Sequence, residues 1–296
     1  MAYVLLWVTA MIWGGGYVAH SMATHMLEAN SFNAARFTLA ALSLMPLLYF
    51  FPHKTTYSFR FLLLAGMLAG SFIFISFTFQ QTGLLYITAG DAGFISSTYI
   101  MMVPILGLLL GYKTTKKVWV GILFALVGLY YLSIGPNLSF HKGDELELAG
   151  AFFWACHVIL ISYLAHRLPA IPLAITQFSF AALLSIIATH MFENPSLTDF
   201  THEWLPILYA GILASGVACT LQILGQKKVS ATVSALILST EAIFAVIADW
   251  LFLDVSLSFN AYIGCGLILV GMLISQWPNE GKLFKGLKTC TRDKTL

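Results

Sequence analysis

The sequence predicts an all-α membrane protein in which ten transmembrane helices form two inverted five-helix repeats. Composition is the first observation that supports this fold class. Hydrophobic residues make up 59% of the 296 residues and charged residues only 9%, whereas about 25% charged residues is usual in soluble domains. So few charges cannot cover a folded chain of this size with polar surface, and lipid must therefore be part of its solvent. The other two observations are long apolar runs and a similarity between the two halves.

The first half of the chain contains five apolar runs long enough to be membrane spans. About 20 helical residues cross a hydrocarbon layer of roughly 30 Å. The first run has no Lys or Arg before it and no convincing small-residue cleavage site, which favours a span over a signal peptide. The fourth contains Pro104 near one end, where a bend is expected. The predicted spans are residues 2–22, 31–51, 60–80, 86–111 and 117–135.

The second half contains five more runs of the same kind. Pro206 lies in the first turn of the third of these, where proline is tolerated. The fourth contains two acids, Glu241 and Asp249. Continuous apolar runs of this length favour helices over the short alternating strands of a membrane β-barrel. The predicted spans are residues 146–166, 171–191, 204–224, 230–252 and 257–277.

The basic residues predict the orientation of these spans. Short connections rich in Lys and Arg lie on the cytoplasmic side. If the N-terminus is cytoplasmic, every Lys and Arg except Lys142 and Arg36 falls in a cytoplasmic connection or in the basic tail, residues 279–296. We therefore expect a multi-pass protein of the plasma (inner) membrane with both termini in the cytoplasm, and we interpret the tail as an anchor at anionic headgroups and not as a nucleic-acid site.

The two halves of the chain are similar in sequence. Residues 33–42 align with residues 174–183, and Trp13 aligns with Trp154. Because five spans is an odd number, the second copy enters the membrane from the opposite side. Residues 1–140 and 141–278 are therefore expected to be inverted repeats, an architecture common in secondary transporters, which bind substrate near the midplane between the halves.

Several segments together resemble the drug/metabolite transporter superfamily, EamA type. These are TAMIWGGGYVA, FNAARFTLAAL, AGDAGFISSTYIMMVPILGLLLG and STEAIFAVIADWLFLD, and the resemblance extends to about Trp277. It implies a permease with a central cavity lined by the first four helices of each repeat, and a peripheral fifth helix. The implied substrates are amino acids, nucleobases, metabolites or drugs, commonly exported. The usual Glu-Pro dipeptide of the ninth helix is Glu241-Ala242 in this chain, so a kink that depends on proline is in doubt.

Glu241 and His157 are the first candidate site residues. A carboxylate inside the membrane must face protein or water, and the position of Glu241 in its span predicts a depth near the midplane. It either binds a substrate amine or a proton, or it fixes the ninth helix as a hydrogen-bonded acid. His157 reaches the same depth, where it either shares a proton with Glu241 or bonds a neighbour as a neutral side chain. Trp13 and Trp154 also share this depth and either stack on substrate or pack between the repeats.

Arg36 needs a counter-charge within the membrane. Asp91 and Asp249 are expected at a similar depth, so the three residues are predicted to form an outer charge cluster that acts as a gate or a structural lock. Three further candidates lie within spans: Tyr17, Tyr99 and Gln177.

The sequence favours a secondary-active transporter of small organic metabolites that works by alternating access over two alternatives. No nucleotide-binding fingerprint or zinc spacing occurs in it, so neither a cofactor nor a metal is expected. An integral-membrane enzyme acting on lipid-linked substrates would usually cluster acids or histidines at one membrane face, and a passive channel would usually carry a charged ring. We expect an exporter whose partners are a small-molecule substrate, the lipid bilayer and, if transport is proton-coupled, protons. We expect no binding of nucleic acid. The protein is expected to be a monomer or a homodimer.

Overall fold

Helices make up all the regular secondary structure of the described part of the chain. The computed structural model describes residues 1–23, 27–50, 57–87, 89–133, 142–253 and 259–276. The first half contains α1 (Ala2–Ala23), α2 (Ala29–Leu44), α3 (Leu47–Phe50), α4 (Phe59–Gly83), α5 (Ala89–Ser97), α6 (Tyr99–Leu109) and α7 (Lys116–Ser133). The second half contains α8 (Lys142–Leu164), α9 (Ala170–Phe192), α10 (Leu197–His202), α11 (Trp204–Leu208), η1 (Tyr209–Ala218), α12 (Cys219–Gln226), α13 (Ala231–Leu238), α14 (Glu241–Leu253) and α15 (Phe259–Gln276).

Each predicted span coincides with one helix or with helices that follow one another along the chain. By length and composition, six stretches of the described residues can cross a membrane: Ala29–Phe50, Phe59–Gly83, Lys142–Leu164, Ala170–Phe192, Trp204–Gln226 and Ala231–Ala248. Shorter apolar helical stretches occupy Ala2–Gly16, Ile95–Leu109 and Phe259–Ser275. The all-α fold class is confirmed for the described residues, and the count of ten spans stays a prediction.

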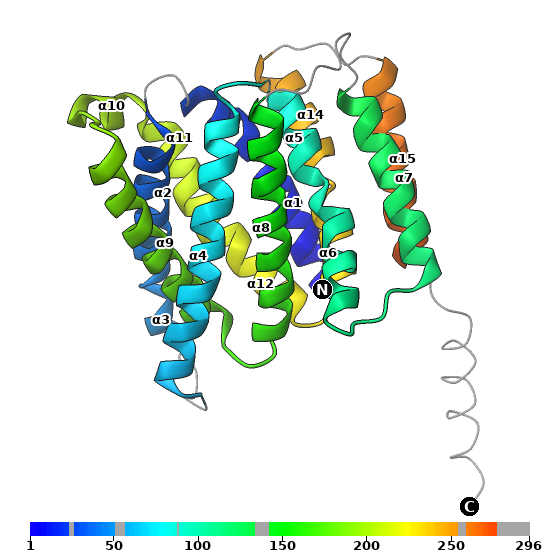
Figure 1. Ribbon diagram of the computed structural model, residues 1–296, viewed down its shortest axis with the longest axis horizontal. Helices are drawn as coiled ribbons and strands as arrows, with labels where there is room; N and C mark the ends of the chain where they lie inside the picture. Colours follow the sequence, from blue (N-terminus) through cyan, green and yellow to red (C-terminus); the bar gives the residue numbers. More distant parts are fainter. Residues whose placement is uncertain (24–26, 51–56, 88, 134–141, 254–258, 277–296) are drawn as a thin grey trace, which may run out of the picture.

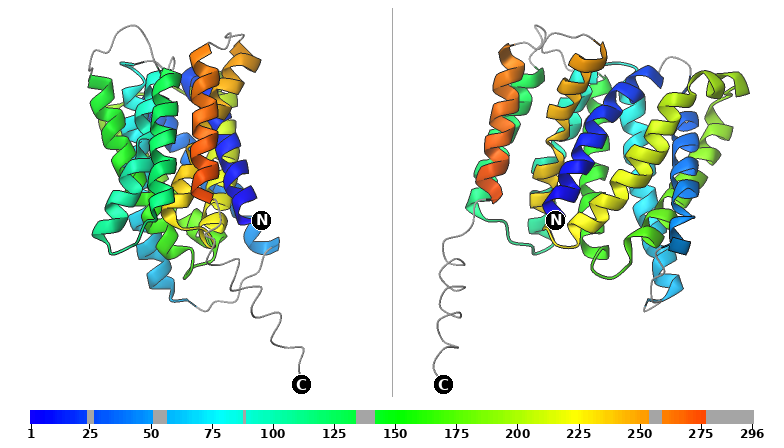
Figure 2. Two further views of the ribbon diagram at one scale, coloured as in Figure 1. Left: turned by 90° about the vertical axis from the view of Figure 1, so that its right-hand side faces the viewer. Right: turned by 180° about the vertical axis from the view of Figure 1, so that it is seen from behind.

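The long helices stand side by side, with connections at the two ends of the bundle (Figure 1). Helices α7 and α15 form a pair at one edge, which is visible from both sides (Figure 2). Glycines set the spacing within this pair, because a Cβ at Gly128 would lie 2.6 Å from the carbonyl oxygen of Gly264 and one at Gly121 would lie 2.5 Å from that of Gly271. Close backbone contact of this kind is typical of helix pairs in membranes.

Large apolar side chains cover the outside of the bundle. On α9, for example, Leu183 is 50% exposed and Ile187 is 48% exposed. Leu64 on α4 and Leu123 on α7 are more than half exposed as well. Apolar surface of this extent needs a nonaqueous partner, and lipid fits the composition of the chain.

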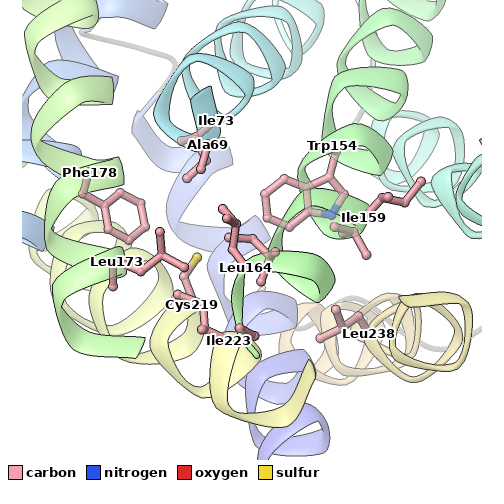
Figure 3. Close-up of a cluster of buried hydrophobic side chains, with 14 of the residues drawn as sticks. Ala69, Ile73, Trp154, Ile159, Leu164, Leu173, Phe178, Cys219, Ile223 and Leu238 are labelled. Atoms are coloured by element: carbon pink, nitrogen blue, oxygen red, sulfur yellow. The ribbon is translucent and has the colours of Figure 1, made fainter. Parts of the chain in front are cut away.

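A core of buried apolar side chains fills the bundle toward the end where the N-terminus lies. Leu6 near the start of α1, Leu44 at the end of α2 and Leu164 at the end of α8 belong to it. Trp154, from the middle of α8, packs in the same cluster (Figure 3). The helix ends that meet at this side of the bundle are therefore closely packed against one another.

Two predicted spans are interrupted near their middle. Helix α5 gives way to α6 at Thr98, whose hydroxyl donates to the carbonyl oxygen of Ile95 at 2.6 Å. Helix α13 gives way to α14 through Ser239 and Thr240, whose hydroxyls donate to the carbonyl oxygens of Leu236 and Ile237. Hydroxyls that bond the preceding turn compete with regular helix bonds and bend helices. The second interruption forms without proline, and the Ala242 N–H, which proline lacks, donates to Ser239 O at 3.3 Å.

Candidate functional site

A cavity inside the bundle gathers aromatic, acidic and basic side chains from both halves of the chain. Among the described residues that line it, none comes from α7 or α15. This distribution agrees with the peripheral fifth helix that the family resemblance implies. The lining residues are Trp13, Gly16, Arg36, Phe77, Gln80, Ser96, Tyr99, Trp154, Ala214 and Glu241.

Glu241 is the acid of this cavity. It is 6% exposed and is the first residue of α14, where the positive end of the helix dipole favours a carboxylate. Helix α1 holds it in place by close packing: a Cβ at Gly14 would lie 2.6 Å from the carbonyl oxygen of Glu241. Trp13, the residue before Gly14, also lines the cavity, so an indole and the acid share its wall.

Three aromatic rings form the side of the cavity that adjoins the apolar core. The rings of Trp13 and Trp154 meet edge to face with their centroids 5.3 Å apart. Phe77 meets Trp154 in the same way at 5.5 Å. Trp13 Nε1 donates to the carbonyl oxygen of Ala214 at 2.8 Å, so its polar edge is satisfied by η1. Since Trp154 belongs to the core and also lines the cavity, these rings are the floor of the cavity.

The π-helical segment η1 supplies the carbonyl groups that hold α1 against the cavity. Besides the bond from Trp13, Ala218 O accepts from the Thr9 hydroxyl at 3.1 Å. In the other direction, the Tyr209 hydroxyl donates to Ile12 O at 2.7 Å. Segments with π-helical bonding occur frequently at functional sites. This segment could not be predicted from the sequence, because it lies within one continuous apolar run.

Arg36 brings a positive charge to the same cavity. Its side chain is 2% exposed. The guanidinium carbon lies 4.1 Å from the centroid of Phe77 and 4.8 Å from that of Phe37. Both distances are within cation–π range. Asp91 and Asp249 lie in α5 and α14, but their side chains are outside the described residues, so the outer charge cluster stays a prediction.

His157 lies behind the cavity wall and does not line it. The ring is fully buried and stacks on Trp154, with centroids 4.9 Å apart and planes at 19°. Its Nε2 atom lies 3.2 Å from Gln177 Oε1 on α9. Of the two interpretations of His157, these contacts favour the hydrogen-bonded side chain over a direct pair with Glu241.

Four of the sequence-predicted candidates therefore lie in the cavity wall together with Arg36: Trp13, Tyr99, Trp154 and Glu241. Gln177 is buried behind the wall with His157. The side chain of Tyr17 is outside the described part of the chain. Sequence reasoning did not select Phe77, Ser96 or Ala214 for the site, because apolar and small residues are common throughout the spans. Phe77 and Gln80 are about one helical turn apart, and this spacing could have indicated that both lie on the same face of α4.

A bundle of apolar helices around an internal polar and aromatic cavity is the arrangement expected of a membrane transporter. Comparison with known proteins gives the same class, because the model of the EamA-like transporter family matches residues 1–134 and 141–276. The chain belongs to this family and, with it, to the drug/metabolite transporter superfamily.

Relatives of similar length carry transporter names. An uncharacterized transporter of Archaeoglobus fulgidus is 32% identical over 269 residues, which cover 90% of this chain and 83% of that protein. The uncharacterized transporter YetK of Bacillus subtilis is 27% identical over 292 residues, covering 93% of this chain and 86% of YetK. A solved crystal structure, 18% identical, matches the fold with a TM-score of 0.77 and covers 93% of this chain and 97% of that one.

Proposed function

We propose that the chain is a secondary-active exporter that carries amino acids or closely related zwitterionic solutes through this cavity by alternating access. The observation that carries the proposal is that one cavity contains an acid, Glu241, a guanidinium, Arg36, and aromatic walls. In a weakly hydrated site, Glu241 binds an ammonium group and Arg36 binds a carboxylate. The rings of Trp13, Phe77 and Trp154 contact the apolar part of the solute.

Alternating access follows from the arrangement of the cavity and the core. The aromatic floor and the packed side chains next to it close the cavity toward the end of the bundle where the N-terminus lies. Passage through the protein therefore requires the helices to separate at this end. Movement of one repeat against the other is the usual way in which transporters of inverted architecture do this.

Contacts across the bundle support the two inverted repeats within this proposal. Trp13 and Trp154, which align in the two halves of the sequence, meet each other in the structure. In the α7–α15 pair, Gly121 packs on Gly271 and Gly128 packs on Gly264. The alignment of residues 119–128 with residues 262–271 in the two halves of the sequence makes each contact the counterpart of the other, as a two-fold axis between the helices requires.

Transport by this protein is, in the same proposal, coupled to proton movement. A single carboxyl group that faces the cavity can bind a proton in one state and the substrate ammonium in the other, because it does not bind both at once. Glu241 is the acid placed for this exchange. Export then uses the proton gradient by releasing the substrate when Glu241 takes up a proton from outside.

Flux measurements on proteoliposomes with three matched solutes test the substrate class. The solutes are phenylalanine, phenylalaninamide, which lacks the carboxylate, and 3-phenylpropionate, which lacks the amine. We expect saturable counterflow for phenylalanine and at least about tenfold lower kcat/KM for the other two, since each loses one charged contact of roughly 1.5 to 3 kcal/mol. Equal flux of all three, or flux that does not saturate, would contradict the proposal and favour a channel.

A further inference from the structure

His157 and Gln177 form a buried pair directly behind the cavity floor. Both side chains are fully buried, and neither belongs to the cavity lining. One face of the His157 ring lies against Trp154, and its Nε2 edge points to Gln177 on α9. The pair thus connects a residue of the cavity wall to a helix that contributes none of the described lining residues.

Trp154 has three ring neighbours with different geometries. Trp13 and Phe77 approach it edge to face, each with an interplanar angle of 71°. His157 is its stacked neighbour, at 19°. His157 is the neighbour that lies against a face of the indole, so any tilt of the Trp154 plane opens or closes the gap between the two stacked faces. The plane of the Trp154 indole is therefore set by the plane of His157.

The plane of His157 is in turn set by its hydrogen bond. Nε2 of His157 lies 3.2 Å from Gln177 Oε1, and the tautomer with its proton on Nε2 donates to this amide oxygen. A hydrogen bond at one edge, together with a stacked partner on one face, leaves the imidazole no free rotation about its side-chain torsions. Gln177 on α9 thus orients the His157 ring, and His157 in turn orients the Trp154 ring.

We infer that His157 is a positioning residue that sets the tilt of Trp154, and through it the shape of the cavity floor that selects the solute. The inference rests on the proposed function for its consequence in transport, because a cavity that carries no solute has no selectivity to set. Its structural part, the control of the Trp154 ring, holds or fails independently of transport.

Fluorine NMR on protein labelled with 5-fluorotryptophan tests the structural part, with the Trp154 signal assigned from Trp154→Phe. We expect His157→Ala to shift and broaden this signal, and His157→Phe, which keeps a ring for stacking, to restore a narrow line. Gln177→Leu, which removes only the hydrogen bond, should give an intermediate result. The matched control is Val158→Ala, since Val158 is the next residue, is fully buried in the core and leaves the stack intact. An unchanged Trp154 signal in His157→Ala and Gln177→Leu would overturn the inference.

Transport kinetics of the same variants test the consequence. We expect His157→Ala to raise KM for an aromatic amino acid by roughly three- to tenfold with Vmax within about twofold of wild type, and His157→Phe to recover most of the affinity. Val158→Ala should change KM by less than about twofold. A fall in Vmax with unchanged KM would contradict a role in selection. If the wild type shows no saturable flux, the proposed function fails, and the NMR result still decides whether His157 positions Trp154.

Discussion

Arg36 and Glu241 line the same cavity, one from α2 in the first half of the chain and one from α14 in the second. Each is almost completely buried, with 2% and 6% of its surface exposed. Placing two opposite charges in a membrane interior is costly unless they face protein groups, water or a ligand of matching charge. Aromatic side chains also line this cavity, and the solute proposed above, with two charged groups and an apolar part, would match the lining.

Replacement of Arg36 by lysine tests the positive charge of this side chain separately from the planar shape of its guanidinium group. Lysine keeps the positive charge but loses the planar guanidinium that lies 4.1 Å from the Phe77 ring centroid. We expect Arg36→Lys to retain folding and to raise KM for carboxylate-bearing solutes by about tenfold, and Arg36→Ala to lower both thermal stability and flux. Full stability and full flux of Arg36→Ala would contradict both the outer charge cluster and the role of Arg36 in the cavity.

Helix packing at the α7–α15 pair depends on one glycine of α15 and not on another. A Cβ at Gly271 would overlap the carbonyl oxygen of Gly121 and lie 3.1 Å from Ala125 N, whereas one at Gly266 would meet nothing within 4 Å. We expect Gly271→Ala to destabilise the protein by about 1 to 3 kcal/mol through overpacking. Gly266→Ala should be neutral or slightly stabilising, since alanine favours the helix. Thermal unfolding in detergent measures both, and equal effects of the two substitutions would show that this contact does not hold the pair together.

Glu193 caps a helix to which it does not belong. It follows α9, and its carboxylate accepts hydrogen bonds from the backbone N–H groups of Asn30 and Ser31 at 2.8 and 2.7 Å, in the first turn of α2. We expect Glu193→Gln to lower stability by about 1 to 3 kcal/mol, because an amide cannot accept at both of its ends. The control is Glu28→Gln, since Glu28 is the N-cap residue of α2 but makes no side-chain capping bond. A larger effect at Glu28 in thermal unfolding would disprove the cap between helices.

Helix positions and several cavity residues could be predicted from the sequence, because apolar run length and the cost of buried charge act locally. Glu241 stood out as an acid in an apolar run, and it lies in the cavity wall. Trp13 and Trp154 stood out because they align between the halves, and their rings meet. The depth of a residue along its helix therefore indicated which residues lie at the same height in the bundle.

The direction in which a side chain points could not be predicted in the same way. His157 shares its depth with Glu241, yet it faces Gln177 because of the rotation of α8 against α9. The contact of the Arg36 guanidinium with the Phe77 ring in the cavity wall was not predicted, and the outer charge cluster with Asp91 or Asp249 stays a prediction. The π-helical geometry of η1 also has no local signal, since its bonds to α1 come from side chains distant in sequence.

Counterflow of a labelled aromatic amino acid in proteoliposomes, with and without an imposed pH gradient, tests the central role of Glu241 most directly. Wild type is compared with Glu241→Gln and with Glu145→Gln, a control on α8 where the acid is exposed. We predict that Glu241→Gln lowers kcat/KM by at least about tenfold, through loss of a charged hydrogen bond, and abolishes the response to the pH gradient. Glu145→Gln should behave as wild type. Flux and pH response that are unchanged in Glu241→Gln would show that Glu241 is structural and that the cavity does not bind the substrate ammonium through it.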